Sequence, residues 1–259
     1  MTHMFDFLQY IQSKLYPIDG HIHLFSHEGP ALAISPSGVG FPDVFVRSHE
    51  ELYDRQHLDD MYAEYINRWP GYTVLATALN PDDAIYIQQK YNLKGFGELK
   101  CYPTHKVNGV DEPLPYKSIK YWRPLFTYAN EHHLPIWIHW SLMSQDDLDK
   151  LLACVRMYRN VNFVLCHCGI DAKETYPEQA FCMCMEFLKE PNAYTDVSFT
   201  AADFLLENPQ YKLPSNKYIV GSDATPHDRE YEADIRAKYI AVYKILGCNN
   251  EVNLKRIFK

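Results

Sequence analysis

Residues 18–24 read Ile-Asp-Gly-His-Ile-His-Leu, and the predicted fold is organised around this stretch. Side chains alternate across a β-strand, so a strand here places His21 and His23 on one face and Ile22 and Leu24 on the other. Two imidazoles in this arrangement lie about 7 Å apart along the strand, and both can reach one metal ion beyond its end. The alternative is a pair of ordinary polar residues on a half-buried strand. The pair alone does not decide between these interpretations.

Beyond this stretch, apolar strands and amphipathic helices alternate along the chain. Strands are predicted over 72–79, 94–100, 135–140, 161–167, 193–198 and 217–223, with a short additional strand over 43–46. Helices are predicted over 1–15, 48–69, 81–91, 118–133, 144–158, 176–189, 201–207 and 228–246, the last of which closes the chain. Turn residues predict a long loop from His27 to Pro42, suited to an active-site lid, and a polar loop runs from the strand at 94–100 through Pro115.

This alternation predicts an α/β fold, in which helices cover a parallel sheet. Seven or eight strand–helix units without an internal break favour a closed (β/α)8 TIM barrel over an open sheet. A chain of 259 residues suits one such barrel, and no shift in composition marks a boundary. Residues 1–259 are therefore predicted to form a single domain.

Charge and composition limit the possible partners. The chain has 25 basic and 33 acidic residues and a net charge of −8, which disfavours extended nucleic-acid binding. The sequence starts without a signal-peptide pattern and has no apolar run of membrane-spanning length, so we expect a cytoplasmic protein. The seven cysteines are an odd number, and several lie in apolar patterns (Cys154, Cys166, Cys168, Cys182 and Cys184). They are predicted to be reduced and buried. The oligomeric state is not predicted.

Ionisable side chains close five of the predicted strands: His21 with His23, Glu98 with Lys100, then His139, His167 and Asp223. In a parallel barrel the carboxyl ends of the strands converge on one mouth. Each residue alone could be a core histidine, a helix cap or a solvated charge. Buried strands exclude unpaired charges, however, so the coincidence indicates one shared site. Three or four histidines with a carboxylate suit a divalent transition metal such as zinc.

The ordered set of His21-Ile-His23, His139, His167 in Leu-Cys-His-Cys-Gly, and Asp223 in Val-Gly-Ser-Asp resembles the amidohydrolase superfamily. It is most similar to the amidohydrolase-related branch of metal-dependent hydrolases and decarboxylases. The resemblance implies a distorted (β/α)8 barrel in which His21, His23, His139 and Asp223 hold a metal. It gives His167 the role of a second-metal ligand or of a catalytic group beside the metal.

Two further residues bear on the number of metal ions. Glu98, in Gly-Phe-Gly-Glu-Leu-Lys, resembles the bridging glutamate of TatD-type hydrolases, whose sites can hold two metals. Other relatives use a carboxylated lysine, and Lys100 is the alternative for that role. Glu98 is preferred because a glutamate binds metal without prior modification. We therefore expect one or two divalent ions, zinc first and manganese as the other option.

The resemblance implies hydrolysis of a small-molecule amide, ester or lactone. A divalent metal lowers the pKa of bound water from about 15.7 towards about 7. Asp223 would accept the proton of the attacking water and pass it to the leaving group, and His167 would stabilise the oxyanion or orient the water. Two alternatives stay open: a TatD-like nuclease or phosphoesterase, and a non-oxidative decarboxylase.

Overall fold

The computed structural model describes residues 18, 20, 22–23, 32–34, 55–68, 71–78, 80–101, 104–107, 110–113, 119–170, 176–223 and 232–259. The predicted helix over 1–15 and the predicted strand over 43–46 lie outside these residues. The same is true of 48–54, the start of the next predicted helix.

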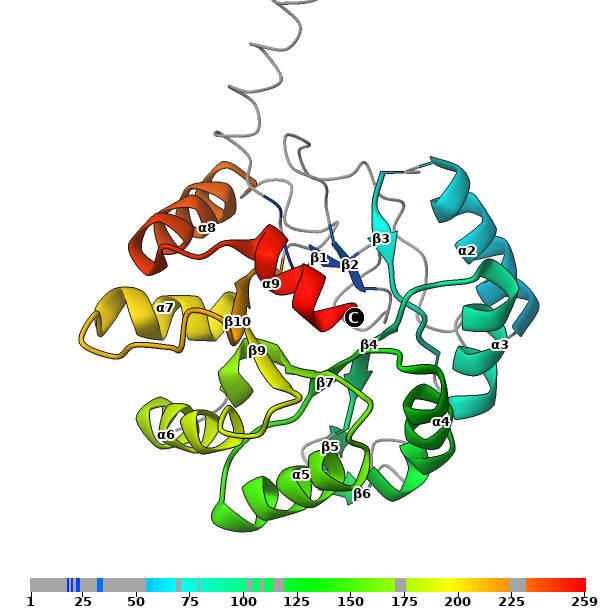
Figure 1. Ribbon diagram of the computed structural model, residues 1–259, viewed down its shortest axis with the longest axis horizontal. Helices are drawn as coiled ribbons and strands as arrows, with labels where there is room; N and C mark the ends of the chain where they lie inside the picture. Colours follow the sequence, from blue (N-terminus) through cyan, green and yellow to red (C-terminus); the bar gives the residue numbers. More distant parts are fainter. Residues whose placement is uncertain are drawn as a thin grey trace, which may run out of the picture.

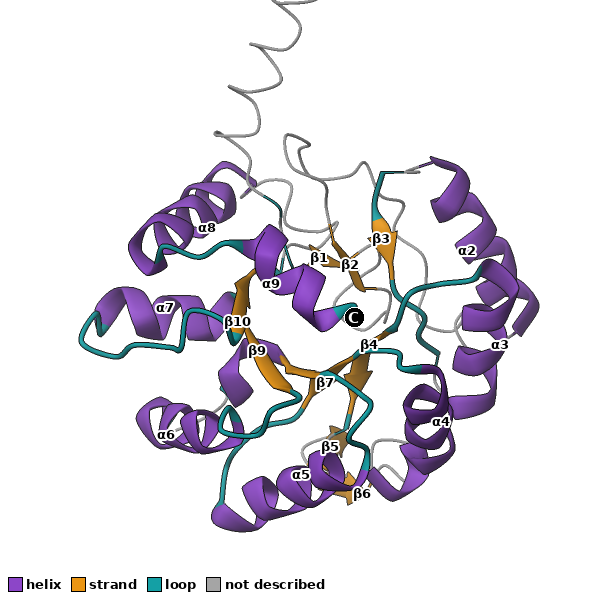
Figure 2. Cartoon of the chain, viewed as in Figure 1, coloured by secondary structure: helices purple, strands orange, loops and turns teal. Residues whose placement is uncertain are grey.

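Two sheets form the centre of the protein (Figure 2). The larger sheet is parallel and has the order β10-β9-β8-β7-β4, comprising Tyr218–Val220, Ala193–Val197, Phe163–Leu165, Ile136–His139 and Phe96–Lys100. The smaller sheet contains β1 (Ile22–His23), β2 (Leu32–Ile34) and β3 (Thr73–Val74), with β2 antiparallel to both neighbours.

Backbone contacts join the two sheets at both edges. Ala76, just beyond β3, forms a parallel bridge with Phe96 of β4, and the Gly97 amide donates to Ala76 oxygen at 3.0 Å. At the other edge the Gly20 amide, before β1, donates to Val220 oxygen of β10 at 3.0 Å. The strands therefore follow one another around an α/β barrel that is distorted, because β2 runs antiparallel.

Two predicted loops contain β structure instead. β2 lies within the loop predicted from His27 to Pro42, because its short apolar segment pairs between β1 and β3. The polar loop predicted through Pro115 contains a hairpin of β5 (Thr104–Val107) and β6 (Val110–Pro113). The sequence between these strands is Asn-Gly, the pair that most favours a tight hairpin turn. This local signal favours the hairpin within an otherwise polar segment.

Helices surround the barrel (Figure 1): α2 (Arg55–Arg68), α3 (Pro81–Tyr91), α4 (Ile119–His132), α5 (Gln145–Met157), α6 (Pro177–Phe187), α7 (Phe199–Glu207) and α8 (Glu232–Leu246). Local signals explain their ends. In α3, for example, the Asn80 side chain accepts a hydrogen bond from the Asp83 amide and Pro81 occupies the first turn. Within the described chain, no helix has both the length and the apolar character needed to cross a bilayer.

A further helix, α9 (Asn250–Ile257), lies across one end of the barrel (Figure 1). The prediction that 228–246 is the closing helix was therefore wrong. Helix α9 is short and mostly polar, so its sequence gives a weak helical signal. Its Leu254 and Ile257 pack onto the barrel interior, and this tertiary contact stabilises the helix.

The barrel interior beneath α9 is apolar. Its layer forms one cluster with Leu254 and Ile257 of α9, and its members are Leu75, Trp137, Val164, Cys166, Tyr194 and Ile219. Trp137 also packs against Phe258, with ring centroids 5.7 Å apart. Side chains alternate along a strand, so the residues two positions after Trp137 and Tyr194 face the interior nearer the carboxyl ends. These residues are His139 and Asp196. Helix α9 thus covers the end at which the strands begin and leaves the other end for polar side chains.

Candidate metal centre

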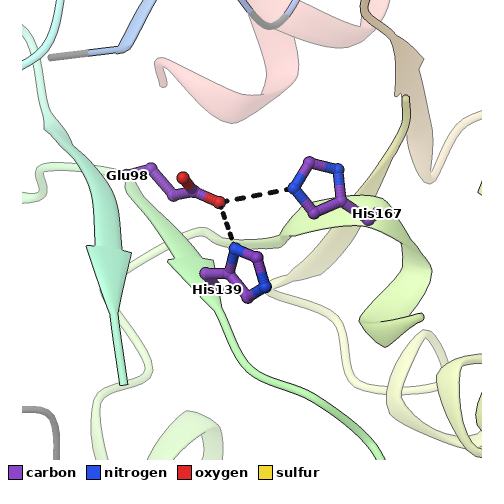
Figure 3. A group of neighbouring side chains, drawn as sticks. All are labelled: Glu98, His139 and His167. Carbon is purple, nitrogen blue, oxygen red and sulfur yellow. Dashed lines mark hydrogen bonds and ion pairs between the residues drawn. The ribbon is translucent and has the colours of Figure 1, made fainter. Parts of the chain in front are cut away.

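Three side chains converge near the carboxyl ends of the strands: Glu98 of β4, His139 of β7 and His167, which follows β8 (Figure 3). Glu98 Oε1 lies 2.6 Å from His139 Nδ1 and 3.4 Å from His167 Nε2. One potential ligand atom from each residue falls within 4.8 Å of the others. Glu98 and His167 are buried, whereas the His139 side chain is 15% exposed. The cluster is thus sheltered but still reached by solvent on one side.

A bulge in β4 directs Glu98 towards this cluster. Phe96 pairs with Ile136 and Leu99 pairs with Ile138, so two residues of β4 oppose Trp137 alone. Without the bulge, strand alternation would place Glu98 on the same face as Phe96, which packs in the outer core. Gly97 makes the bulge possible, because it has φ +150° and an added Cβ would lie 2.6 Å from the Trp137 Cβ.

His167 does not close its strand as predicted. β8 ends at Leu165, and the chain then turns through Cys166–Gly169, where His167 and Cys168 have left-handed φ values of 53° and 55°. The His167 amide donates to Asp196 Oδ1 at 3.0 Å, which holds this turn. The predicted strand over 217–223 also ends early, at Val220, and Asp223 has a left-handed φ of 57°. Histidine and aspartate adopt this conformation more readily than most residues.

The turn brings His167 close to Asp223, with 4.0 Å between His167 Nε2 and Asp223 Oδ2. The structure thus brings together four of the predicted site residues: Glu98, His139, His167 and Asp223. His21 lies outside the described residues. For His23 and Lys100 only the backbone is described, in β1 and β4, so the roles of these three residues stay predictions.

Two buried residues that the sequence did not identify support His167. Asp196 lies in β9, and Ser198 is the first residue after this strand. Neither side chain is exposed to solvent. Ser198 Oγ donates to Asp196 Oδ1 and lies 2.8 Å from His167 Nδ1. A carboxylate inside an otherwise apolar strand was the available signal, because such a strand excludes unpaired charge.

The centre carries concentrated negative charge. Burial, reinforced by the charges of Asp196, Glu98 and Asp223, raises the pKa of the Cys166 thiol well above its ordinary value. Cys166 is therefore a neutral thiol in the metal-free protein. All seven cysteines are free, and Cys182 is exposed on α6, which corrects the expectation that it is buried. It lies on the solvent face of the helix, a side that the apolar pattern did not reveal.

The donor set fits a divalent transition metal. A carboxylate oxygen and two imidazole nitrogens are ligands of zinc, manganese and iron, and their mutual spacing is short enough for one ion. Glu98 and Asp223 would supply the negative charge that balances such an ion. The observed chemistry of the site therefore agrees with a metal centre at the mouth of the barrel.

The chain matches the amidohydrolase family model over residues 18–241. It therefore belongs to the amidohydrolase family and is an amidohydrolase-related, metal-dependent enzyme. No curated protein matches the sequence.

Three solved structures illustrate what the chain is similar to. One is a dihydroxybenzoic acid decarboxylase from Polaromonas sp. JS666 with bound manganese and the inhibitor 2-nitroresorcinol, at 14% identity and a TM-score of 0.49, covering 86% of this chain and 83% of that chain. Another is 2,6-dihydroxybenzoate decarboxylase from Rhizobium, at 16% identity and a TM-score of 0.45, with coverage of 83% and 82%. A third is an uncharacterised TIM-barrel protein from Bordetella bronchiseptica, at 11% identity and a TM-score of 0.47, with coverage of 77% and 71%. Likenesses this distant assign no activity to this chain.

Proposed function

We propose that this protein is a metal-dependent hydrolase that acts on a small-molecule amide, ester or lactone. The observation that carries the proposal is the convergence of Glu98, His139 and His167, with Asp223 4.0 Å from His167. In the proposal these four residues, with His21 and His23, hold one or two divalent ions, either zinc or manganese. When bound, such an ion polarises a carbonyl oxygen and lowers the pKa of water from about 15.7 to about 7.

Asp223 supplies the proton transfer in this mechanism. Its carboxylate is buried at the mouth of the barrel, next to the donor set. An ionised carboxylate there accepts the proton that the attacking water loses and returns it to the leaving amine or alkoxide. The reaction then needs no other titrating group, because the same residue acts first as a base and then as an acid.

The charge of the site favours a neutral reacting group. Among the described residues, Glu98, Asp196 and Asp223 all act on the buried thiol of Cys166, which raises its pKa. Glu98 and Asp223 offset the charge of one bound divalent ion, and Asp196 adds a further negative charge that an incoming phosphodiester or carboxylate would meet. The net charge of −8 acts in the same direction over a longer range. An uncharged amide, ester or lactone meets no such barrier.

Metal content tests the first half of the proposal. Elemental analysis of the purified protein, and of protein incubated with zinc or manganese, is expected to give one or two ions per chain. Glu98→Gln, His139→Ala and His21→Ala are expected to reduce this content, because each removes a ligand. His132→Ala is the matched control, since it deletes an exposed imidazole on α4. A wild-type protein that neither carries nor takes up a divalent ion would overturn the proposal.

Substrate assays test the second half. The zinc and manganese forms are incubated with lactones, aryl esters, amides, hydroxylated aromatic acids and single-stranded DNA. Hydrolysis is expected only for the first three classes, with incorporation of oxygen from isotopically labelled water. Release of carbon dioxide without hydrolysis would replace the proposal with the decarboxylase alternative. Cleavage of DNA would replace it with the nuclease alternative.

A further inference from the structure

Ser198 is not used in the way its position in the fold suggests. It occupies the N-cap position of α7 with φ −144° and ψ 167°, but its side chain makes no capping hydrogen bond. A serine at this position ordinarily accepts a hydrogen bond from an amide of the first helical turn. The Ser198 hydroxyl instead donates to Asp196 Oδ1 and lies 2.8 Å from His167 Nδ1. The Ser198 hydroxyl therefore hydrogen-bonds within the candidate metal centre and does not cap the helix.

The number of available protons determines which ring nitrogen of His167 is protonated. A hydroxyl has one proton, and an ionised carboxylate can only accept. The Ser198 proton goes to Asp196, so Ser198 Oγ must accept from His167, and Nδ1 carries a hydrogen. A direct bond from Nδ1 to Asp196 Oδ1 is too long, at 3.7 Å, so the carboxylate acts on the ring through Ser198.

The same carboxylate also holds the backbone of His167. Asp196 Oδ1 accepts from the His167 amide at 3.0 Å, which fixes the left-handed turn. This bond and the bond from Ser198 Oγ to Asp196 Oδ1 are both buried, so water does not compete for them. Asp196 thus fixes the position of the residue through the amide and the orientation of the ring through Ser198.

We propose that Asp196 and Ser198 are positioning residues that hold His167 in the Nδ1-protonated tautomer and direct its Nε2 lone pair into the metal centre. The inference rests on the proposed function, since it takes the centre to bind a divalent ion. His167 Nε2 faces Glu98 at 3.4 Å and Asp223 at 4.0 Å. A lone pair beside two carboxylates is stabilised by a cation. This assigns His167 to metal binding through Nε2, and not to hydrogen-bond donation towards an oxyanion.

NMR of the ring nitrogens in the zinc-loaded full-length protein tests the tautomer directly. The signals of His167 are identified by their loss in His167→Gln. The wild type is expected to show protonated Nδ1 and unprotonated Nε2, and Ser198→Ala to lose this preference. Ser198→Thr keeps a hydroxyl and is expected to restore it. Thr195→Val is the control: it removes a buried hydroxyl from the same strand, one that donates to Leu165 oxygen.

Zinc affinity, measured by titrating the metal alone against a competing chelator, gives the second readout. Ser198→Ala is expected to weaken zinc binding by about 10–100-fold, with recovery in Ser198→Thr and no loss in Thr195→Val. Should Ser198→Ala fail to fold, Asp196→Asn gives the same test with the side-chain shape retained, and a smaller loss of affinity is expected because only the charge is removed.

A wild-type His167 protonated at Nε2 overturns the inference, as does wild-type zinc affinity in a folded Ser198→Ala protein. Failure of the proposed function is recognised separately. In that case the wild type binds no metal at all, and the positioning role is read from Nδ1 alone, which lies 2.8 Å from Ser198 Oγ. Protonated Nδ1 that depends on Ser198 supports the positioning role even then.

Discussion

The two ends of the barrel are built from the same strands but from opposite kinds of side chain. In β7 the interior residues are Trp137 and then His139, and in β9 they are Tyr194 and then Asp196. The first of each pair packs in the apolar layer under α9, and the second lies at the polar end. Two residues of strand, about 7 Å, therefore separate a layer that stabilises the fold from a layer that carries chemistry.

The difference is also visible in the backbone. The apolar end uses regular strands and a packed helix. The polar end requires a bulge at Gly97 and left-handed residues at His167 and Asp223. Buried charges need hydrogen bonds and fixed orientations, and regular strands alone do not provide them. Substitutions at the polar end should thus affect catalysis, and substitutions at the apolar end should affect stability.

Asp223→Asn should produce the largest effect. Loss of the proton-accepting carboxylate is expected to lower turnover by about 10⁴-fold, equal to about 5.5 kcal/mol, with little change in the free energy of unfolding. Turnover is measured on the substrate class found in the hydrolysis assays. Asp203→Asn is the control, because this exposed carboxylate on α7 pairs with Lys238 of α8. Near-wild-type turnover in Asp223→Asn would remove Asp223 from the mechanism.

Ile257→Ala should produce the opposite result. Ile257 is buried on α9 against the barrel interior, so the cavity is expected to reduce the free energy of unfolding by about 3 kcal/mol. Urea denaturation measures this loss, and zinc affinity should not change. Val252→Ala on the same helix is the control, because Val252 is exposed and its loss should cost less than about 0.5 kcal/mol. Weaker zinc binding in Ile257→Ala would show that the two ends are coupled.

Asn250→Ala sharpens the comparison, because Asn250 is a buried polar residue on α9 with a structural role. Its amide nitrogen donates to Val220 oxygen at 2.7 Å and to Ile18 oxygen, and its Oδ1 accepts from the Val220 amide at 2.8 Å. It thus ties β10 to the segment before β1. Its removal is expected to reduce the free energy of unfolding by about 2 kcal/mol. Zinc affinity should stay at the wild-type level, and a loss of affinity would contradict a purely structural role.

Sequence patterns predicted the features of the fold and site that depend on local or repeating signals. The bounds of α3 agree with the prediction of 81–91 because Asn80 and Pro81 mark its start. His139 was placed correctly at the end of β7 because an apolar run ended there. The bulge at Gly97 could not be predicted, since it is defined only by pairing with Trp137 on another strand. The roles of Asp196 and Ser198 depend on hydrogen bonds to His167, which lies about thirty residues earlier and is turned by its own backbone.

The smallest effect concerns the thiols, and it tests how closed the polar end is. Cys166 and Cys168 flank His167 and are buried, and the pKa of each thiol lies well above its ordinary value. For Cys166 the main cause is burial, and for Cys168 it is a hydrogen bond with Cys184, followed by burial. A raised pKa keeps a thiol neutral as the pH rises, so at about pH 8 these groups lack the reactive thiolate.

Cys182 is the one exposed cysteine of the seven. A thiol reagent at about pH 8 is therefore expected to label Cys182 alone in the native protein, and all seven cysteines after unfolding. Cys182→Ser should abolish the native reaction and leave both zinc affinity and the free energy of unfolding unchanged. Rapid labelling of Cys166 in that variant would mean that reagent enters beside His167. Solvent would then reach the polar end as deep as Cys166. The buried hydrogen bonds of Asp196 would have to form in competition with water.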